Sequence, residues 1–414
     1  MTSISSATNS NSFTNKLPAT QANPTITQQA ISQLLQFLGK NHYQGWEPYD
    51  IRLRNWPAWL TSRPLRVLVT QLMRISPRPI LRSVQRPQFY ANAVALFAQA
   101  FLILYRITGQ SEFRQRAIFF LDWLQQHRSP VTNNFSIGAS YQVNLKDYGA
   151  QPDSPAPFIT AMAVEAFLAG FEILREQRYL EFAESGIRFF LDELPQIQVT
   201  PNQRYFVYHP NNHRFYPNLP AVVAGTLAHF CSISPDSIAL ETAISNLRYV
   251  VNWQRPDGSW FYRPNVRYCD NFHTGFILEA LAKFEHYLQD QTFRDHLLKG
   301  LNYYQHQLFH ASGRPRHKRL YGLPTNADSL LTRLDLRDCA QGIILYSLLA
   351  RWDRKFFDAA INLAEWTINN FRAPEGFFYY QQLPCYIIKG PFISMQAWML
   401  LALSKLAFAS QSYC

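Results

Sequence analysis

The sequence predicts an all-α fold in which six helical hairpins close into an (α/α)6 toroid. Three observations support this prediction: six segments are apolar nearly all round, each has a partner with a single apolar stripe, and the pairs recur at a loose period. Aromatic, strand-like pieces such as EGFFYYQQL follow Gly, Pro and Asn turns, so short β-hairpin-like connections are expected between the hairpins.

The all-round apolar segments are expected to form an inner ring, because a helix that is buried on every side lies inside. They span residues 88–107, 157–173, 218–233, 271–288, 335–351 and 391–408. The striped segments are expected outside; in 292–309, for example, Leu297, Leu301 and Leu308 share one face. The others are 112–126, 178–193, 238–254, 355–371 and, from the opposite end of the chain, 26–39. Because 26–39 can pair with the last segment, a closed ring is favoured over an open superhelix.

Composition and charge restrict the class of partner. The 414 residues carry 39 Lys and Arg against 28 Asp and Glu, a formal net charge of +11 that favours an anionic partner. An anionic oligo- or polysaccharide, a lipid pyrophosphate or a membrane surface would fit. Nucleic acid is not expected, because the basic residues are scattered and no nucleic-acid-binding motif is present. Only 16 glycines occur, without a Gly-rich phosphate loop, so a nucleotide cofactor is not expected.

The ends of the chain and its cysteines point to a cytoplasmic protein. Residues 1–25 are polar and predict a disordered tail, and 26–410 are expected to form a single toroid domain. The five cysteines show no CxxC spacing, which favours a reducing compartment and no zinc site. No cofactor is expected. Segment 61–84 is both apolar and basic. It would pack on the toroid or lie on the inner face of a membrane.

Several motifs carry a resemblance to a known group. The stretches NWQRPDGSWFY, DNFHTGFILEAL, DLRDCAQGIILYSLL, EGFFYYQQL and MQAWMLLAL occur in this order over most of residues 40–408. The chain resembles a group of toroid proteins encoded with polysaccharide-biosynthesis genes. These are similar in architecture to six-hairpin glycosidases, uronate lyases and the helical domain of glucuronyl C5-epimerases. The resemblance implies a fold and a glycan context, and it does not specify a reaction.

A second resemblance concerns residues 246–260, NLRYVVNWQRPDGSW, which look like the Gln-Trp repeat of terpenoid cyclases. In that repeat Gln254 would cap a helix and Trp260 would stack on its end. The acidic Asp-x-Asp-Asp motif of those cyclases is missing here, and DLRD at 335–338 has only two carboxylates. The Gln-Trp element is therefore interpreted as a turn stabiliser, and cyclase chemistry is kept as a lesser alternative.

Candidate catalytic residues gather where the inner helices begin, since these helix starts frame one mouth of a toroid and present free N–H groups. His273 lies in the first turn of the fourth inner helix, where the helix dipole favours a neutral ring that can accept a proton. Tyr148 and Tyr262 could serve as acid or base, and Asp338 could serve as a carboxylate catalyst. For His273 the alternative is a buried histidine satisfied by a backbone carbonyl.

Candidate substrate-binding residues surround these positions. Arg333 and Arg337 could hold a carboxylate, or instead form a local network with the acidic residues beside them. The full binding set is Trp46, Asp50, Trp260, Asp270, Asn271, Arg333, Asp335, Arg337 and Gln341. Asp270, Asn271 and Asp335 could equally be simple N-caps. Glu47 and Tyr49 stand beside Asp50 in GWEPYDIRLRN.

These residues fit a carbohydrate-active enzyme that acts on an anionic glycan or a lipid-linked glycan precursor by lyase, epimerase or hydrolase chemistry. Abstraction of a C5 proton needs a base, a group that neutralises the carboxylate, and an acid. Hydrolysis needs two carboxylates across a cleft, for which Asp50, Asp270, Asp335 and Asp338 are candidates. The alternative from another class is a non-catalytic glycan-binding or scaffold protein of a polysaccharide assembly complex.

Overall fold

The computed structural model describes residues 26–50, 64–65, 68–69, 72, 86–144, 149–208, 214–322 and 333–413. The predicted tail, residues 1–25, lies outside this part of the chain. So do the predicted catalytic residue Tyr148 and most of the 61–84 segment, together with its proposed membrane contact.

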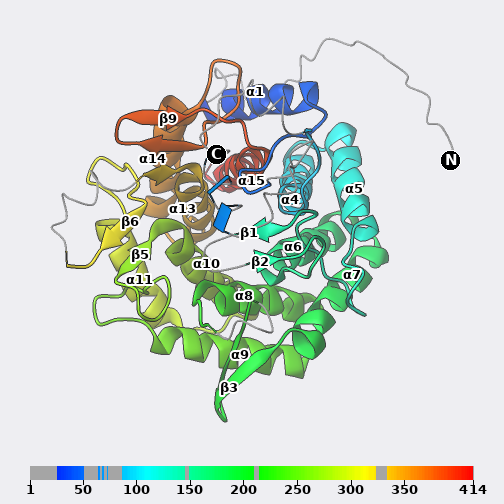
Figure 1. Cartoon of the computed structure of the whole chain (residues 1–414), viewed down its shortest axis with the longest axis vertical. Helices are drawn as coiled ribbons and strands as arrows, with labels where there is room; N and C mark the ends of the chain where they lie inside the picture. Colours follow the sequence, from blue (N-terminus) through cyan, green and yellow to red (C-terminus); the bar gives the residue numbers. More distant parts are fainter. Residues whose placement is uncertain are drawn as a thin grey trace.

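Within the described ranges, twelve α-helices form two concentric rings (Figure 1). The inner ring consists of α4 (Ala91–Thr108), α6 (Pro157–Leu174), α8 (Asn218–Ile233), α10 (Asn271–Leu288), α13 (Leu336–Leu349) and α15 (Ile393–Ser410). The outer ring consists of α1 (Ile26–Lys40), α5 (Ser111–Gln126), α7 (Gln177–Arg188), α9 (Ser237–Asn252), α11 (Arg294–Gln307) and α14 (Arg354–Phe371). Every predicted helix is present, and a π-helical turn, Phe189–Glu193, continues α7.

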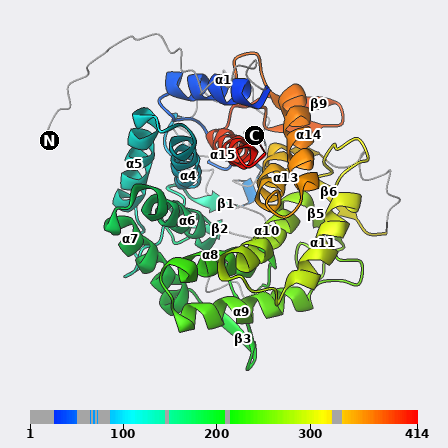
Figure 2. The same cartoon turned by 180° about the vertical axis from the view of Figure 1, so that it is seen from behind.

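The inner ring is closed. Each inner helix contacts the inner helices before and after it in the chain, and α15 contacts α4. The outer helix α1 packs on α14 and α15, so the N-terminal helix completes the sixth hairpin (Figure 2). The predicted (α/α)6 toroid is therefore confirmed, and it is closed by the pairing that the sequence predicted between its two ends.

Burial on two sides explains the apolar character of the inner helices. Three of them, α4, α6 and α15, are long and apolar enough to span a membrane by length and composition. In the toroid each packs against inner neighbours on both flanks and against the outer ring. Some contacts are close: a Cβ on Gly225 of α8 would lie 3.2 Å from the Cα of Ala280 on α10. Glycine therefore permits these two backbones to approach.

The short strands lie in the connections and form four small sheets. Three pairs are local hairpins: β1 (Val143–Asn144) with β2 (Gly149–Ala150), β3 (Gln196–Thr200) with β4 (Gln203–Phe206), and β8 (Gln381–Leu383) with β9 (Tyr386–Ile388). Two other pairs join different connections: β5 (Tyr268–Asp270) with β6 (Lys318–Leu320), and β7 (Leu334–Asp335) with β8. The latter two pairs fix the starts of α10 and α13 relative to distant loops.

The Gln-Trp element stabilises the turn after α9, as the sequence interpretation proposed. The Gln254 side chain donates hydrogen bonds to the carbonyls of Gly258 (3.1 Å) and of His296 on α11 (2.9 Å). Trp260 is buried and its Nε1–H donates to the Val250 carbonyl at 2.9 Å. This tryptophan therefore joins α9 to the turn and packs in the outer layer.

Candidate active site

The candidate site lies at the end of the toroid where the six inner helices begin, called here the N-terminal mouth. Consecutive inner helices are joined through an outer helix, so all six run in the same direction and their N-termini meet at one end (Figure 1). The strand pairs β5–β6 and β7–β8 bring two further connections to this end. Polar residues from four separate parts of the sequence therefore converge there.

The first functional pair is His273 with Asp270 at the start of α10. Asp270 caps the helix by accepting the His273 backbone N–H at 2.8 Å, and its two carboxylate oxygens lie 2.8 and 2.9 Å from His273 Nδ1. Burial opposes ionisation of Asp270, but the contact with His273 outweighs it and lowers the pKa of the carboxyl to about 2. An ionised carboxylate only accepts hydrogen bonds, so Nδ1 carries the proton and Nε2 is left as a base.

The second pair, His317 with Asp338, was missed in the sequence. His317 Nδ1 lies 2.8 Å from Asp338 Oδ2, which also accepts the Asp335 backbone N–H at 3.0 Å. The other oxygen, Oδ1, is buried and has no hydrogen-bond partner among the described residues. Burial raises the pKa of Asp338, against the pull of His317. The backbones that carry the two pairs are adjacent, since the Asn271 N–H donates to the His317 carbonyl at 3.0 Å.

Both histidines share one arrangement of hydrogen bonds. Within the described chain neither Nε2 makes a hydrogen bond, while each Nδ1 is held by a carboxylate. The side chain of His273 is 30% exposed and that of His317 is 10% exposed, so solvent reaches the first imidazole more readily than the second. A carboxylate that fixes the tautomer and orientation of an imidazole is a common arrangement for a general acid or base.

Asp335 and Arg337 form a closed ion pair at the start of α13. The Arg337 Nε and NH2 groups each donate to one Asp335 oxygen at 2.9 Å, and Gln381 donates to the same carboxylate. Arg337 also lies 3.4 Å from the Tyr49 hydroxyl and over the Phe272 ring. The predicted substrate clamp by Arg337 is therefore corrected: its bidentate capacity is used by Asp335, as in the alternative of a local network.

A second wall of the mouth comes from the N-terminal segment and α4. Asp50 is buried and accepts hydrogen bonds from Gln88 Nε2 and the Tyr90 hydroxyl, both at 2.9 Å. Glu47 is also buried, and its Oε2 has no hydrogen-bond partner among the described residues. Burial raises the pKa of Glu47 to about 7, although Ser394 and Arg337 favour its charged form. This wall therefore adds a carboxyl group that can exchange a proton near neutral pH.

Aromatic rings line the axis below the mouth. Phe276 contacts Phe158 edge-on with centroids 4.9 Å apart, and Trp398 lies 5.7 Å from Phe276 and 5.6 Å from Phe272. We call these four residues the aromatic collar. Phe272 also meets the His273 ring at 5.5 Å, so the collar begins at the His273–Asp270 pair. Such rings suit the apolar face of a sugar.

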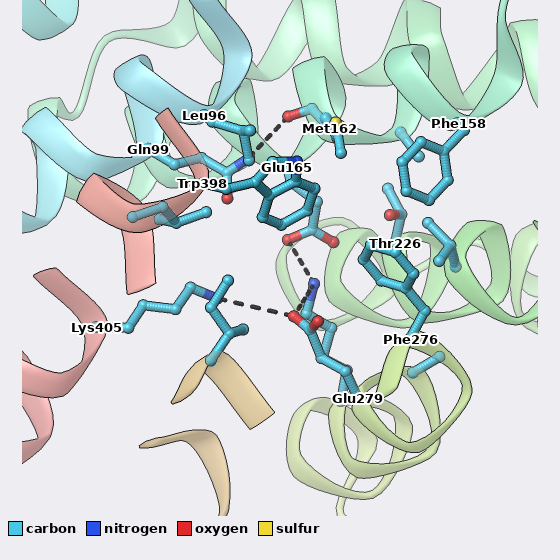
Figure 3. Close-up of a pocket in the computed structure, with 16 residues that line it drawn as sticks. Leu96, Gln99, Phe158, Met162, Glu165, Thr226, Phe276, Glu279, Trp398 and Lys405 are labelled. Atoms are coloured by element: carbon cyan, nitrogen blue, oxygen red, sulfur yellow. Dashed lines mark hydrogen bonds and ion pairs between the residues drawn. The ribbon is translucent and has the colours of Figure 1, made fainter. Parts of the chain in front are cut away.

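Three of the collar residues, Phe158, Phe276 and Trp398, line an axial cavity with a volume of about 50 Å³ (Figure 3). Lys283 lies 3.3 Å from Glu165 and 3.4 Å from Glu279, and Lys405 lies 3.8 Å from Glu279. On the far side, His229 bridges Glu165 (3.1 Å) to Glu172. These buried charges connect α6, α8, α10 and α15 across the axis.

Some predicted binding residues are occupied by structural contacts. The Asn271 side chain is fully buried, donates to the Leu308 carbonyl at 3.0 Å and accepts the Tyr304 hydroxyl at 2.6 Å. Gln341 is fully buried and donates to Glu279 at 2.7 Å, below the mouth. Trp260 packs in the outer layer. These three predictions are corrected, because polar atoms and rings that are buried in such contacts are not presented to a ligand.

The remaining predicted residues lie at or near the mouth. Tyr262 meets His273 edge-on at 4.7 Å, and burial keeps its phenol protonated by raising its pKa. Trp46 is mostly buried, and its carbonyl accepts the Ile393 N–H at 2.9 Å where α15 begins. Arg333 precedes β7 and is partly exposed. Among the described residues, no group of three His, Cys, Asp or Glu side chains could hold a metal ion.

The comparisons with known proteins concern the fold. No protein-family model and no curated protein matches the chain. A cellobiose 2-epimerase from Bacillus thermoamylovorans superposes with a TM-score of 0.60 at 11% identity, over 91% of this chain and 98% of that one. A D-mannose isomerase has a TM-score of 0.60 at 10% identity, over 95% and 99%.

A third solved structure, a glycoside hydrolase family 76 mannosidase from Bacteroides thetaiotaomicron, has a TM-score of 0.59 at 12% identity and covers 94% of this chain and 99% of its own. At these identities the likeness shows the fold alone. The chain thus has the (α/α)6-toroid, six-hairpin glycosidase-like fold shared by this mannosidase, the cellobiose 2-epimerase and the D-mannose isomerase.

Proposed function

We propose that the protein is a carbohydrate-acting enzyme that moves a proton at a sugar carbon next to a carbonyl or carboxyl group, as an epimerase or isomerase does. The observation that carries the proposal is the presence of two histidine–aspartate pairs, His273–Asp270 and His317–Asp338, at one mouth. Two imidazoles with free Nε2 atoms supply one base and one acid, which is what removal and return of a proton require.

The proposed reaction needs one proton acceptor and one proton donor on the protein, and the two imidazoles supply both. One neutral imidazole takes the C–H proton, and the electron pair moves into the adjacent carbonyl to give an enediolate. For epimerisation the second imidazole, in its protonated form, returns a proton to the opposite face of the same carbon. For isomerisation it protonates the neighbouring carbon, while the proton of the hydroxyl on the first carbon passes to the alkoxide oxygen of the former carbonyl. The aromatic collar would hold the sugar ring, and the carboxylates keep both imidazoles in the reactive tautomer.

Hydrolysis is the less supported reaction. It needs one carboxyl acid and one carboxylate base or nucleophile that are free to reach the substrate. Asp270 and Asp338 are bound to imidazoles and Asp335 is bound to Arg337, so three of the four predicted carboxylates are already engaged. The fold is compatible with either reaction, since a mannosidase and a cellobiose 2-epimerase share it.

The proposal extends to the class of substrate and to the cellular setting. An anionic glycan or a lipid-linked precursor in cytoplasmic polysaccharide biosynthesis is supported by the net charge of +11 and by the motifs that resemble proteins of such gene clusters.

Exchange with deuterated water tests the proposed reaction. Aldoses, disaccharides and uronic acids are incubated with the protein in deuterated water and analysed by NMR. Deuterium at the carbon beside the carbonyl or carboxyl is expected, and it should disappear in both His273→Gln and His317→Gln. Binding of sugars without any exchange across the panel would contradict the enzyme and favour the glycan-binding alternative.

A further inference from the structure

Two cations lie in the connections that carry the histidine pairs: Lys318 on β6 follows His317, and Arg333 directly precedes β7 and Asp335. In the β5–β6 ladder Lys318 lies directly opposite Asp270, so the two side chains project from the same face of the sheet. The Lys318 ammonium lies 4.3 Å from the centroid of the Tyr268 ring, two residues before Asp270 on that face. Lys318 is thus held beside the first catalytic pair.

Among the residues that the structure describes, neither cation has a carboxylate as an ion-pair partner. No ion pair joins Lys318 or Arg333 to any described residue, and Arg333 Nε is buried without a hydrogen-bond partner among them. The surrounding carboxylates are engaged elsewhere: Asp270 by His273, Asp338 by His317, and Asp335 by Arg337. This differs from the axial cavity, where each lysine has a glutamate within 4 Å.

The lack of an ion-pair partner for these two cations among the described residues makes the folded protein less stable. Burial and, to a lesser degree, the nearby charge of Arg333 lower the pKa of Lys318, against the attraction of Asp270 and Asp338. A buried N–H donor without a partner also destabilises the folded chain. A bound anion that contacts both groups would stabilise the charged form of Lys318 and give the Arg333 N–H a hydrogen-bond acceptor.

We propose that Lys318 and Arg333 form an anion-binding subsite at the rim of the N-terminal mouth, which binds the carboxylate or phosphate group of the sugar that reacts at the histidine pairs. The inference rests on the proposed function and names its substrate class. A uronic acid and a sugar phosphate share the required chemistry, and the test separates them. Arg337 is not part of the subsite, because Asp335 neutralises it.

The test is calorimetric binding of three matched sugars: glucose, glucuronate and glucose 6-phosphate. The full-length protein is expected to bind at least one of the two anionic sugars about tenfold or more tightly than glucose. Lys318→Met and Arg333→Met should each reduce this preference several-fold, and the double variant should abolish it, while glucose binding is unchanged. Lys299→Met, on the exposed face of α11, is the matched control and should keep the preference.

Several outcomes would overturn the subsite: equal binding of all three sugars, no binding of either anionic sugar, or a preference that survives in the double variant. If a methionine variant does not fold, Lys318→Gln and Arg333→Gln replace it. Raising the salt concentration with the unmodified protein must also weaken only the anionic sugars. Sugar binding and deuterium exchange test the two proposals separately. If the protein prefers anionic sugars but catalyses no deuterium exchange, the proposed enzyme activity is refuted and the subsite is retained. If it catalyses exchange but does not prefer anionic sugars, the activity is retained and the subsite is refuted.

Discussion

The Nδ1 atom of His317 lies 2.8 Å from Oδ2 of Asp338, although 21 residues separate them in the chain. The contact exists because the β5–β6 ladder places His317 against the start of α10, while Asp338 lies in the first turn of the neighbouring inner helix α13. The pair therefore depends on the ring closing correctly. Asp338 also accepts the Asp335 N–H in the capping box of α13, so asparagine, whose side-chain oxygen can keep this bond, is the conservative change.

Asp338→Asn is expected to reduce the rate of deuterium exchange by at least about 100-fold. Replacing a carboxylate beside a catalytic histidine with an amide strongly lowers kcat in enzymes that use such a pair. The neutral amide carries no charge to stabilise the imidazolium that forms when His317 takes up a proton, so His317 becomes a weaker base. The measurement is kcat for exchange, together with sugar binding by calorimetry. Asp353→Asn at the start of outer helix α14 is the matched control. An unchanged kcat in Asp338→Asn would exclude His317 as the base.

Asp270 is expected to make stability depend on pH in the acid range. Its folded-state pKa is about 2 against an ordinary value of 3.8. The depressed pKa contributes stability that is present above about pH 4 and is lost as the pH falls towards 2, about 2 kcal/mol in all. Asp270→Asn retains a good N-cap but lacks this contribution. Urea unfolding at several pH values should show the gap between the two proteins closing as the pH falls; a constant gap would contradict the assignment.

The rings were predictable from the sequence because they depend on local periodicity. Apolar residues on all sides, or on one stripe, determine whether a helix lies inside or outside, and Asp270 and Asp335 were recognisable as helix caps. The mouth was only partly predictable. His317 reaches it through strand pairing between distant loops, for which HKRLY carries no periodic signal.

Polar residues near helix starts were also ambiguous. Asn271 and His273 stand two positions apart in the first turn of α10, yet Asn271 turns into the ring and bonds Tyr304 and Leu308, while His273 faces the mouth. Composition does not distinguish these two directions. Likewise Arg337 was expected to bind a ligand, and only the structure shows that Asp335 occupies both of its donor groups.

Lys283 is expected to be essential for stability, because it lies between Glu165 and Glu279 in the axial cavity. Lys283→Met leaves two buried carboxylates short of a cation and should lower the free energy of unfolding by about 3–5 kcal/mol. Adding Glu165→Gln should recover part of the loss. The check is urea unfolding, with Lys299→Met expected to change stability by less than about 0.5 kcal/mol. A loss in Lys283→Met no larger than in this control would show that the network contributes nothing.

Glu47→Gln is expected to stabilise the protein at mildly alkaline pH. The carboxyl has a pKa of about 7 in the folded chain against 4.5 ordinarily, mainly because it is buried. A raised carboxyl pKa favours folding at low pH and loses this advantage as the pH rises from about 4.5 through 7, a change of about 3 kcal/mol. Glutamine has the shape of the neutral acid and carries no charge, so the variant should lack this decline and be the more stable protein at about pH 8. Denaturant unfolding across this range measures the effect. Parallel curves for the two proteins would mean that Glu47 is already ionised near pH 5, and would exclude it as a proton donor in the mouth at neutral pH.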